Sequence, residues 1–281
     1  MFEFFKKYRK TILATLIFLI LLVNVCVIMV SYISDYLKQS ATEIVGSVEV
    51  DKVSFCTDKD YFKDVPAYTY DSISLAFENS FEYYLADAYV TSDGMLVCSA
   101  SDDLKDVIGI DGKLGEHTYY DLLNYTILHK GKPTSYPIMP CEDFAGYCVD
   151  LSLTPVIYPH GFSSLEPIEN ILKTYEHGDY IVIMSDDFGL LRNISEKYPE
   201  IRLWYMVDEA VDEVIDNMNL LPDAQILFNG KNRKNNDETV ERIKERGVSF
   251  GCYNVNKRSA LKRYISLGAS EIITSRFVKS R

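Results

Sequence analysis

The sequence predicts an α/β fold, a TIM (β/α)8-type barrel preceded by one N-terminal transmembrane helix. Two observations predict the barrel. Short apolar runs alternate with amphipathic segments from residue 53 onward, which is the pattern of a parallel sheet with helices outside it. About eight such runs occupy roughly 240 residues, which fits a closed barrel better than an open sheet. A third observation predicts the helix, because residues 11–33 contain no charged side chain.

The N-terminal segment has the length and the flanks of an uncleaved membrane anchor. As a helix, residues 11–33 would span a hydrocarbon core of ~30 Å, and four cations precede them at positions 6–10. A cleaved signal peptide would have an apolar core of only ~7–15 residues and a small-residue cleavage site. A buried core helix is the other alternative, but it rarely carries so long an uncharged run beside a basic flank.

We therefore expect two domains. Residues 1–38 form a cytoplasmic basic stub and transmembrane anchor with a juxtamembrane segment, and residues 39–281 form the barrel domain. Cations favour the cytoplasmic side of a membrane. The protein is thus expected in the cell membrane as a single-pass protein, with a cytoplasmic N-terminus and an extracytoplasmic barrel domain.

Charge and cysteine content limit the class of protein. The formal net charge is −12, which argues against nucleic acid as a partner because its phosphates require a basic surface. The hydrophobic fraction of 47% argues against disorder over most of the chain. Of the six cysteines, Cys141 and Cys148 lie close enough in sequence to pair in an extracytoplasmic compartment. The alternative is that the cysteines are small buried hydrophobic residues. No CxxC motif and no zinc-ligand spacing occurs.

Each expected strand is a short apolar run bounded by turn residues. The stretch 85–104 is typical of a hairpin, because Asp93-Gly94 forms a turn between two apolar runs. The other strands are expected at 53–56, 154–161, 179–185, 200–207, 224–229, 248–255 and 269–274.

The segments between the strands have helical periodicity. Ile73 and Phe77 begin a spacing of three to four residues that is typical of an amphipathic helix. Gly247 and Gly268 are helix stop signals. Helices are expected at 72–84, 117–128, 140–150, 163–176, 187–199, 208–221, 236–247 and 257–268.

In such a barrel, chemistry takes place at the C-terminal ends of the strands. No GxGxxG follows the first strand and no GxxxxGK[ST] is present, so neither nucleotide-binding motif is available. The residues expected at the strand ends are Cys56, Asp87, Ser99–Asp103, Tyr158–Gly161, Ser185–Asp187, Val207, Asp208, Asn229 and Tyr253–Asn256.

Four stretches in the right order carry a family resemblance. They are "YDSISLAFENSFEYYLADAYVTSDGMLV", "TYYDLLNYTI", "DYIVIMSDDFGLLRNISEKYPEIRLWYMV" and "ERIKERGVSFGCYNVNKRSALKRYISLGASEIITS". Together they resemble the glycerophosphodiester phosphodiesterase family over roughly residues 53–276. The resemblance implies a TIM barrel that hydrolyses a phosphodiester with two histidines and a Ca²⁺ or Mg²⁺ ion. The histidines act as general base and acid, and the ion is held by a Glu-x-Asp pair and a later Glu.

The chain departs from this family at nearly every functional position. Its four histidines lie at 117, 129, 160 and 177, whereas both family histidines are expected before about residue 102. Asp87 alone matches a functional position of the family. The corresponding residues are Phe55–Thr57 for His-Arg-Gly, Leu85 and Asp87 for Glu-x-Asp, Ala100 and Ser101 for the second histidine motif, and Ile157–Pro159 for the later Glu-x-Lys.

Three residues remain as candidates for a site. Asp87 is either a residual metal ligand or a polar residue that forms hydrogen bonds at the barrel mouth. Asp102, beside Asp103, either replaces a lost ligand or belongs to a solvated loop. His160 is the histidine at a catalytically suitable strand end, or else a loop histidine without function.

Two further features have a functional and a structural interpretation. The "SDD" at 185–187 either contacts a polar ligand or caps a helix. Tyr253, at the position of a family Trp, either stacks on a sugar or glycerol face or belongs to the core.

Three hypotheses follow. The first is a membrane-anchored, catalytically degenerate member of the family that binds or scaffolds an envelope phosphodiester or glycan system. The second is an active metal-dependent phosphodiesterase with a rebuilt site that uses Asp87, Asp102 and His160, with Ca²⁺ or Mg²⁺ as cofactor. The third is a glycan-active TIM-barrel enzyme with paired acidic residues. Loss of a general acid or base typically costs ~10²–10⁴-fold in rate. Because both family histidines are missing, the first hypothesis is preferred over the second.

Overall fold

The computed structural model describes residues 52–162, 164–176, 180–221 and 223–277, which all belong to one compact unit, Gly46–Arg281. Among the helices formed by these residues, none has the length and apolar character needed to cross a membrane. The anchor expected at residues 11–33, and with it the domain expected at 1–38, lies outside the described residues.

Eight parallel strands close into a barrel, as the sequence predicts. Strand β1 pairs with β12 on one side and with β2 on the other, and this second pairing closes the sheet. The barrel strands, in order around the sheet, are β1 (Ser54–Thr57), β2 (Tyr83–Val90), β7 (Thr154–Pro159), β8 (Val182–Ser185), β9 (Arg202–Val207), β10 (Gln225–Asn229), β11 (Phe250–Tyr253) and β12 (Glu271–Ile273).

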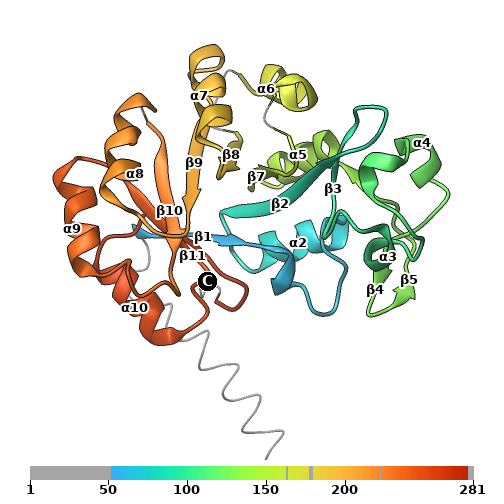
Figure 1. Ribbon diagram of the computed structural model, residues 1–281. Coiled ribbons are helices and arrows are strands. Elements are labelled where there is room, and N and C mark those ends of the chain that lie inside the picture. The colour runs from blue at the N-terminus through green and yellow to red at the C-terminus, as the bar shows by residue number, and fades with distance from the viewer. Residues whose placement is uncertain (1–51, 163, 177–179, 222, 278–281) are drawn as a thin grey trace, which may run out of the picture. The chain divides into compact units, whose positions relative to one another are not determined.

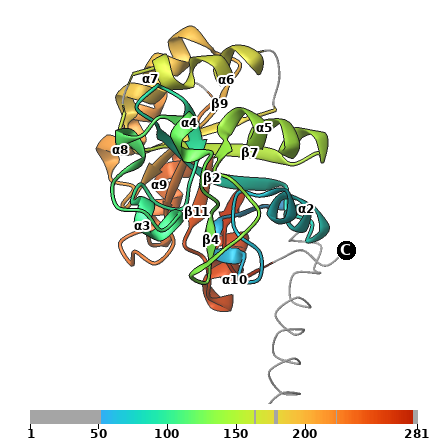
Figure 2. The same cartoon turned by 90° about the vertical axis from the view of Figure 1, so that its right-hand side faces the viewer.

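Helices follow the strands and lie outside the barrel (Figures 1 and 2). Side chains cap several of them: Thr69 and Ser72 form a capping box, and Asn236 accepts from the Thr239 N–H. The helices are α2 (Tyr70–Glu78), α5 (Cys141–Asp150), α6 (Glu169–Thr174), α7 (Phe188–Lys197), α8 (Asp212–Asn217), α9 (Asp237–Glu245) and α10 (Arg258–Ser266).

The helix expected at 72–84 ends earlier than predicted. It stops at Glu78, and Ser80 then adopts a left-handed conformation with φ of 59°. Tyr83 and Tyr84 belong instead to β2, because this strand pairs with both β1 and β7 at these residues. Pairing on both sides therefore outweighs the helical spacing of the preceding residues.

The predicted hairpin is present and opens an insert between β2 and α5. Strand β2 pairs antiparallel with β3 (Leu96–Cys98), and β3 pairs with β6 (Met139–Pro140). The helix expected at 117–128 is only one turn, α4 (Tyr119–Leu122). The insert has a small core of its own, formed by Val97, Leu104, Val107, Ile108, Leu114, Leu122 and Ile138. Its other elements are α3 (Leu104–Val107), the 3₁₀ helix Leu114–Glu116, β4 (Leu128–His129) and β5 (Lys132–Pro133).

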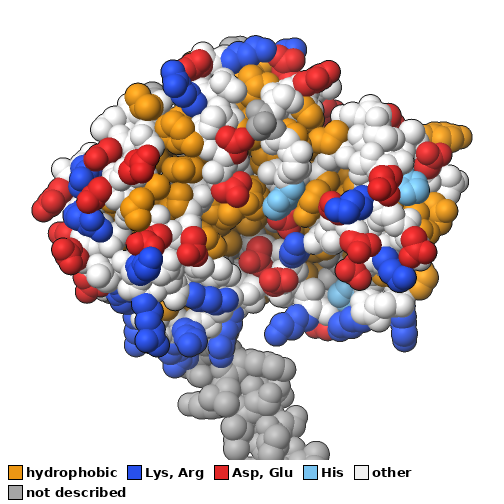
Figure 3. Space-filling view, in the orientation of Figure 1, with side chains coloured by type: hydrophobic (Ala, Val, Ile, Leu, Met, Phe, Trp, Pro, Cys, Tyr) orange, Lys and Arg blue, Asp and Glu red, His pale blue; other side chains and the backbone are white. Residues whose placement is uncertain are grey.

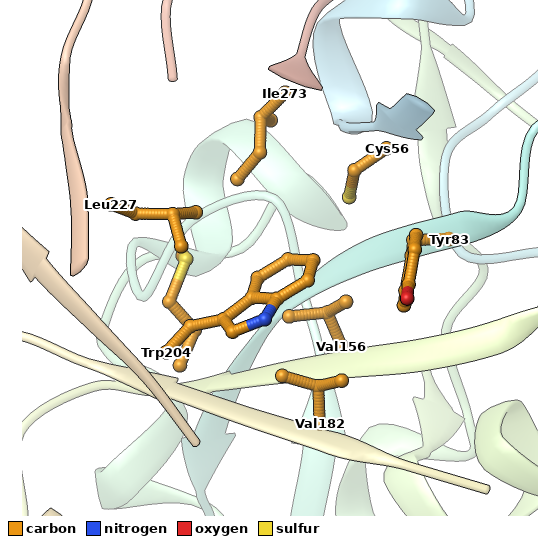
Figure 4. Packing of buried hydrophobic residues seen from close by; sticks show 8 residues of the cluster. Cys56, Tyr83, Val156, Val182, Trp204, Leu227 and Ile273 are labelled. Atoms are coloured by element: carbon orange, nitrogen blue, oxygen red, sulfur yellow. The ribbon is translucent and has the colours of Figure 1, made fainter. Parts of the chain in front are cut away.

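Large apolar side chains fill the barrel interior. Figure 4 shows the Trp204 indole near the middle of this cluster, with Leu227, Ile273 and Val156 around it. The full cluster is Cys56, Tyr83, Val156, Val182, Met184, Trp204, Leu227 and Ile273. Because side chains alternate along a strand, the inward residues nearer the strand C-termini cover this cluster. They are Leu85, Tyr158, Met206 and Tyr253.

The proposed pairing of Cys141 with Cys148 is wrong. Both residues lie on α5, seven positions apart, which corresponds to ~10 Å along a helix. A disulfide requires Cα atoms within ~7 Å. All five cysteines of the described residues are buried, as the alternative interpretation expected.

Candidate functional site

The candidate site is a cluster of polar side chains around Asp87, at the C-terminal end of the barrel strands. Asp87 lies on β2, and His160 directly follows β7, the neighbouring strand. His160 Nε2 lies 2.8 Å from Asp87 Oδ1. Lys59 Nζ lies 2.8 Å from Asp87 Oδ2, and the Tyr68 hydroxyl donates to the same oxygen at 3.0 Å. Both carboxylate oxygens of Asp87 are therefore engaged by protein groups.

These contacts keep Asp87 ionised although it is largely buried. Its side chain is 14% exposed. Burial alone would raise its pKa, but the hydrogen bond from His160 and the charge and hydrogen bond of Lys59 outweigh burial, so the pKa lies below its ordinary value. An ionised carboxylate can only accept hydrogen bonds, so His160 carries its hydrogen on Nε2.

Lys59 is held in place by the turn that follows β1. It begins a short 3₁₀ helix (Lys59–Tyr61), and Asp58 caps this helix by accepting from the Asp60 N–H at 3.0 Å. Lys59 Nζ also donates to the Ala100 carbonyl at 2.6 Å. The ammonium group thus connects the end of β1, the end of β2 and the insert.

Asp58 is an acidic group with an unusual pKa beside this cluster. Burial, together with the neighbouring charges of Asp60 and Asp87, raises its pKa to about 6. The folded chain therefore destabilises the ionised form of Asp58 at neutral pH, whereas it stabilises the ionised form of Asp87.

The His160 ring lies among tyrosines. It stacks on Tyr89 with 4.8 Å between ring centroids and an interplanar angle of 13°. On the same ring, Tyr158 packs at 4.1 Å with a tilt of 54°. The His160 side chain is 29% exposed. Its orientation is therefore fixed by Asp87 and two aromatic rings, while part of the ring remains accessible.

Further aromatic and acidic residues continue this surface around the mouth. Tyr158 and Tyr253 are half-buried over the barrel core. Burial and the charges of Asp208 and Asp186 raise the pKa of Tyr253 to about 12, and burial and Asp186 also raise the pKa of Tyr158. The negative charge of Asp186 therefore acts on both rings, and that of Asp208 acts on Tyr253. Figure 3 shows hydrophobic, acidic and histidine side chains gathered near the middle of one face of the molecule.

Asp208 is fixed at its strand end by two amides. Its two carboxylate oxygens accept from Asn229 Nδ2 at 2.8 Å and from Asn232 Nδ2 at 2.9 Å. Asp187 of the predicted "SDD" caps α7 by accepting from the Leu190 N–H. Helix capping thus explains Asp187, whereas Asp186 is exposed beside the tyrosines.

Asp102 does not join the cluster around Asp87. Its carboxylate pairs with Lys113 Nζ at 3.0 Å within the insert, where the Lys113 and Asp102 side chains are 65% and 39% exposed. Asp103 caps α3 by accepting from the Lys105 N–H. Of the three candidates from sequence, the structure brings Asp87 and His160 together and leaves Asp102 on the insert.

Sequence reasoning missed Lys59 and Tyr68. Lys59 follows the first strand at the same end of the barrel as Asp87, and this proximity was a usable signal. Tyr68 gave no such signal, because it precedes α2 and reaches Asp87 through a left-handed backbone conformation with φ of 58°.

The donor set of this cluster does not fit a Ca²⁺ or Mg²⁺ ion. These ions require several oxygen ligands, mostly carboxylates. The neighbouring inward positions are Leu85 and Tyr158, and both oxygens of Asp87 already contact other groups. Within the described part of the chain, no group of three or more His, Cys, Asp or Glu side chains is arranged to hold a metal.

A pocket of ≈ 270 Å³ lies beside the cluster, between the turn after β1 and the insert. Lys59 and Tyr68 line it on the barrel side. Its remaining walls come mainly from the insert, including Cys98, Ile138 and His129. Lys59 and Tyr68 therefore both contact Asp87 and line this pocket.

Comparisons with known proteins agree with this geometry at the level of the fold. A phosphodiesterase from Oleispira antarctica, solved with the product sn-glycerol-3-phosphate, is 18% identical with a TM-score of 0.70, over 79% of this chain and 93% of that one. A glycerophosphodiester phosphodiesterase from Thermotoga maritima is 18% identical with a TM-score of 0.64, over 80% and 95%. A search of curated proteins finds no significant match. The model of the glycerophosphoryl diester phosphodiesterase family matches residues 61–279, and the chain belongs to this family.

Proposed function

We propose that this family member is catalytically degenerate and binds the polyol or sugar part of an envelope phosphodiester or glycan without hydrolysing it. The observation that carries the proposal is the state of Asp87. The one carboxylate at a matching family position is neutralised by Lys59 and further engaged by Tyr68 and His160. No second carboxylate is available at Leu85 or Tyr158 to complete an ion site.

The aromatic mouth supports a polyol or sugar as the ligand. Tyrosine rings stack on the apolar faces of sugars, while carboxylates and amides accept or donate hydrogen bonds to hydroxyl groups. Tyr89, Tyr158 and Tyr253 provide half-buried rings. The charges of Asp186 and Asp208 act on two of these rings. Acidic groups so placed disfavour a free phosphate, so an uncharged part of the ligand is expected to occupy the mouth.

A second candidate function rests on the Asp87–His160 pair. A histidine that donates Nε2–H to a carboxylate can take a proton on its other nitrogen, which is the arrangement of a general base. On this reading the domain is an active phosphodiesterase whose site has been rebuilt. Lys59 would then supply the positive charge beside Asp87 in place of a metal ion.

One experiment separates the two functions. The purified full chain is assayed for hydrolysis of glycerophosphocholine with Ca²⁺, Mg²⁺, Mn²⁺ or EDTA, and its Tm is measured with glycerol, sn-glycerol 3-phosphate and envelope glycan fragments. Binding without hydrolysis is expected, seen as a rise in Tm that disappears in Tyr253→Ala. Turnover that falls ~10²–10⁴-fold in His160→Gln would establish the second function instead.

His117→Gln is the matched control for the histidine variant. His117 lies on the insert, directly after the 3₁₀ helix Leu114–Glu116, and is not among the residues that line the pocket beside Lys59. This substitution is expected to leave ligand-induced shifts in Tm unchanged. If both histidine variants alter binding equally, the effect is not specific to the cluster around Asp87.

The location of the domain is also a proposal. The uncharged run at 11–33 and the cations before it support an uncleaved anchor with the domain outside the cytoplasm. Protease added to intact cells is expected to degrade the C-terminal domain. Degradation only after lysis would place the domain in the cytoplasm.

A further inference from the structure

Two cysteines from different parts of the chain meet beneath the insert. Cys98 is the last residue of β3, and Cys141 is the first residue of α5. Strand β3 pairs antiparallel with β6 and places Cys98 opposite Met139, and Cys141 begins α5 directly after β6. Cys98 Sγ and Cys141 Sγ lie 3.2 Å apart, and both side chains are buried.

The geometry favours this pair over the other cysteines. A disulfide bond is about 2.05 Å long, so the two sulfur atoms need to approach by only about 1 Å. Cys148 lies two turns further along α5. Cys56 and Cys252 are on the barrel strands β1 and β11. Among the described cysteines, Cys98 and Cys141 are the pair whose sulfur atoms lie close enough to form a bond.

We propose that Cys98 and Cys141 form a disulfide when the chain folds in an oxidising compartment. The oxidant is a disulfide-bearing exchange partner, such as a disulfide oxidoreductase or oxidised glutathione. One cysteine thiolate attacks that disulfide and forms a mixed disulfide, and the second cysteine then displaces the partner thiol. The two cysteines lose two protons and two electrons in total, and the partner disulfide is reduced to two thiols.

The exchange takes place before the insert is fully packed. Burial and the neighbouring Cys141 thiol raise the pKa of Cys98 well above its ordinary value, so little thiolate is available in the folded chain. Once formed, the bond links β3 to α5 and closes a loop of 43 positions that contains the rest of the insert. Cys98 also lines the pocket beside Lys59, so the bond fixes part of the wall of that pocket.

The test is a disulfide map of the full chain. The protein is refolded in detergent with reduced and oxidised glutathione, blocked with N-ethylmaleimide, digested and analysed by mass spectrometry. We expect a linked peptide that contains Cys98 and Cys141, with the other cysteines alkylated. Alkylation of every cysteine in a chain with native circular dichroism, or a link that excludes either residue, would overturn the proposal.

Thermal unfolding gives an independent readout. Closing a loop of this length is expected to raise the Tm of the oxidised chain by roughly 5–15 °C over the chain treated with dithiothreitol. This difference should persist in Cys148→Ser and Cys252→Ser, which are the matched controls. It should vanish in Cys98→Ser and in Cys141→Ser. An equal redox-dependent shift in all four variants would refute the assignment.

Discussion

Replacement of Lys59 by methionine tests the central contact of the site. The substitution keeps much of the side-chain length but removes the ammonium group that lies 2.8 Å from Asp87 Oδ2. It also removes the 2.6 Å hydrogen bond to the Ala100 carbonyl. Asp87 would retain its contacts with His160 and Tyr68, so each carboxylate oxygen would keep one hydrogen-bond partner.

The expected loss of stability lies between those of a surface pair and a buried pair. The side chains of Lys59 and Asp87 are 33% and 14% exposed. Surface ion pairs contribute about 0–1 kcal/mol, whereas breaking a buried pair costs about 3–5 kcal/mol. We therefore expect the free energy of unfolding to fall by about 1–3 kcal/mol at pH 7. For a domain of this size this corresponds to a fall in Tm of roughly 2–12 °C.

The pH dependence separates the two lost contacts. Because the folded-state pKa of Asp87 is lowered, its ionised form contributes stability above its unfolded pKa of about 3.9, and this stability is lost as the pH falls through the folded pKa. The part of the loss in unfolding free energy that comes from the contact with Asp87 should therefore shrink below about pH 4. The part that comes from the Ala100 carbonyl should remain at every pH.

The assay is chemical unfolding of the full chain and its variants at pH 7 and below pH 4. A double-mutant cycle with Asp87→Asn isolates the pairwise energy. Lys113→Met, which removes the solvated pair with Asp102, is the control and should leave Tm unchanged. The reasoning is refuted if Lys59→Met and Asp87→Asn are additive, or if the whole effect of Lys59→Met is independent of pH.

Three further predictions follow from the described contacts. Asp58→Asn should stabilise the fold at pH 7, because the carboxylate with a pKa of about 6 destabilises the folded state as the pH rises from about 4 to 6. Chemical unfolding measured across this range should therefore show a free energy of unfolding that depends less on pH in the variant. Gly251→Ala should lower the free energy of unfolding by about 1–3 kcal/mol, because its Cβ would lie 2.8 Å from the Glu271 carbonyl oxygen; an unchanged denaturation midpoint would contradict this. Thr69→Ala should cost about 0.5–2 kcal/mol through loss of the α2 capping box, measured in the same way, whereas Thr69→Ser should retain most of the stability.

The barrel could be predicted from sequence because its signals are local. Apolar runs such as residues 182–185 and 226–228 form strands that are buried on both faces, as expected of a parallel sheet. Helix ends were also readable, for example at Gly247 and Gly268, which adopt positive φ. The error at 79–84 arose because Tyr83 and Tyr84 pair with two strands that are distant in sequence, and periodicity alone does not report such pairing.

The candidate site was only partly predictable, because it depends on contacts between distant residues. Asp87 and His160 could be placed at neighbouring strand ends by the order of the elements. The ion pair of Lys59 with Asp87 depends on how the turn after β1 folds over the mouth, and the sequence gives no direct measure of that. Asp102 is the converse case, since its position near a strand end suggested a ligand but the insert supplies Lys113 as its partner.

The barrel and its mouth can change independently because they rely on different residues. The interior is closed by apolar side chains such as Trp204 and Leu227, whereas polar side chains such as Asp87 and Lys59 form the mouth. At the mouth, the Asp87 side chain is only 14% exposed, and a carboxylate buried to this extent without a counter-charge would be costly. Lys59 removes this cost by bringing an ammonium group to Asp87. Asp87 therefore stays ionised and ordered at the mouth, where it contacts the His160 ring that stacks on Tyr89.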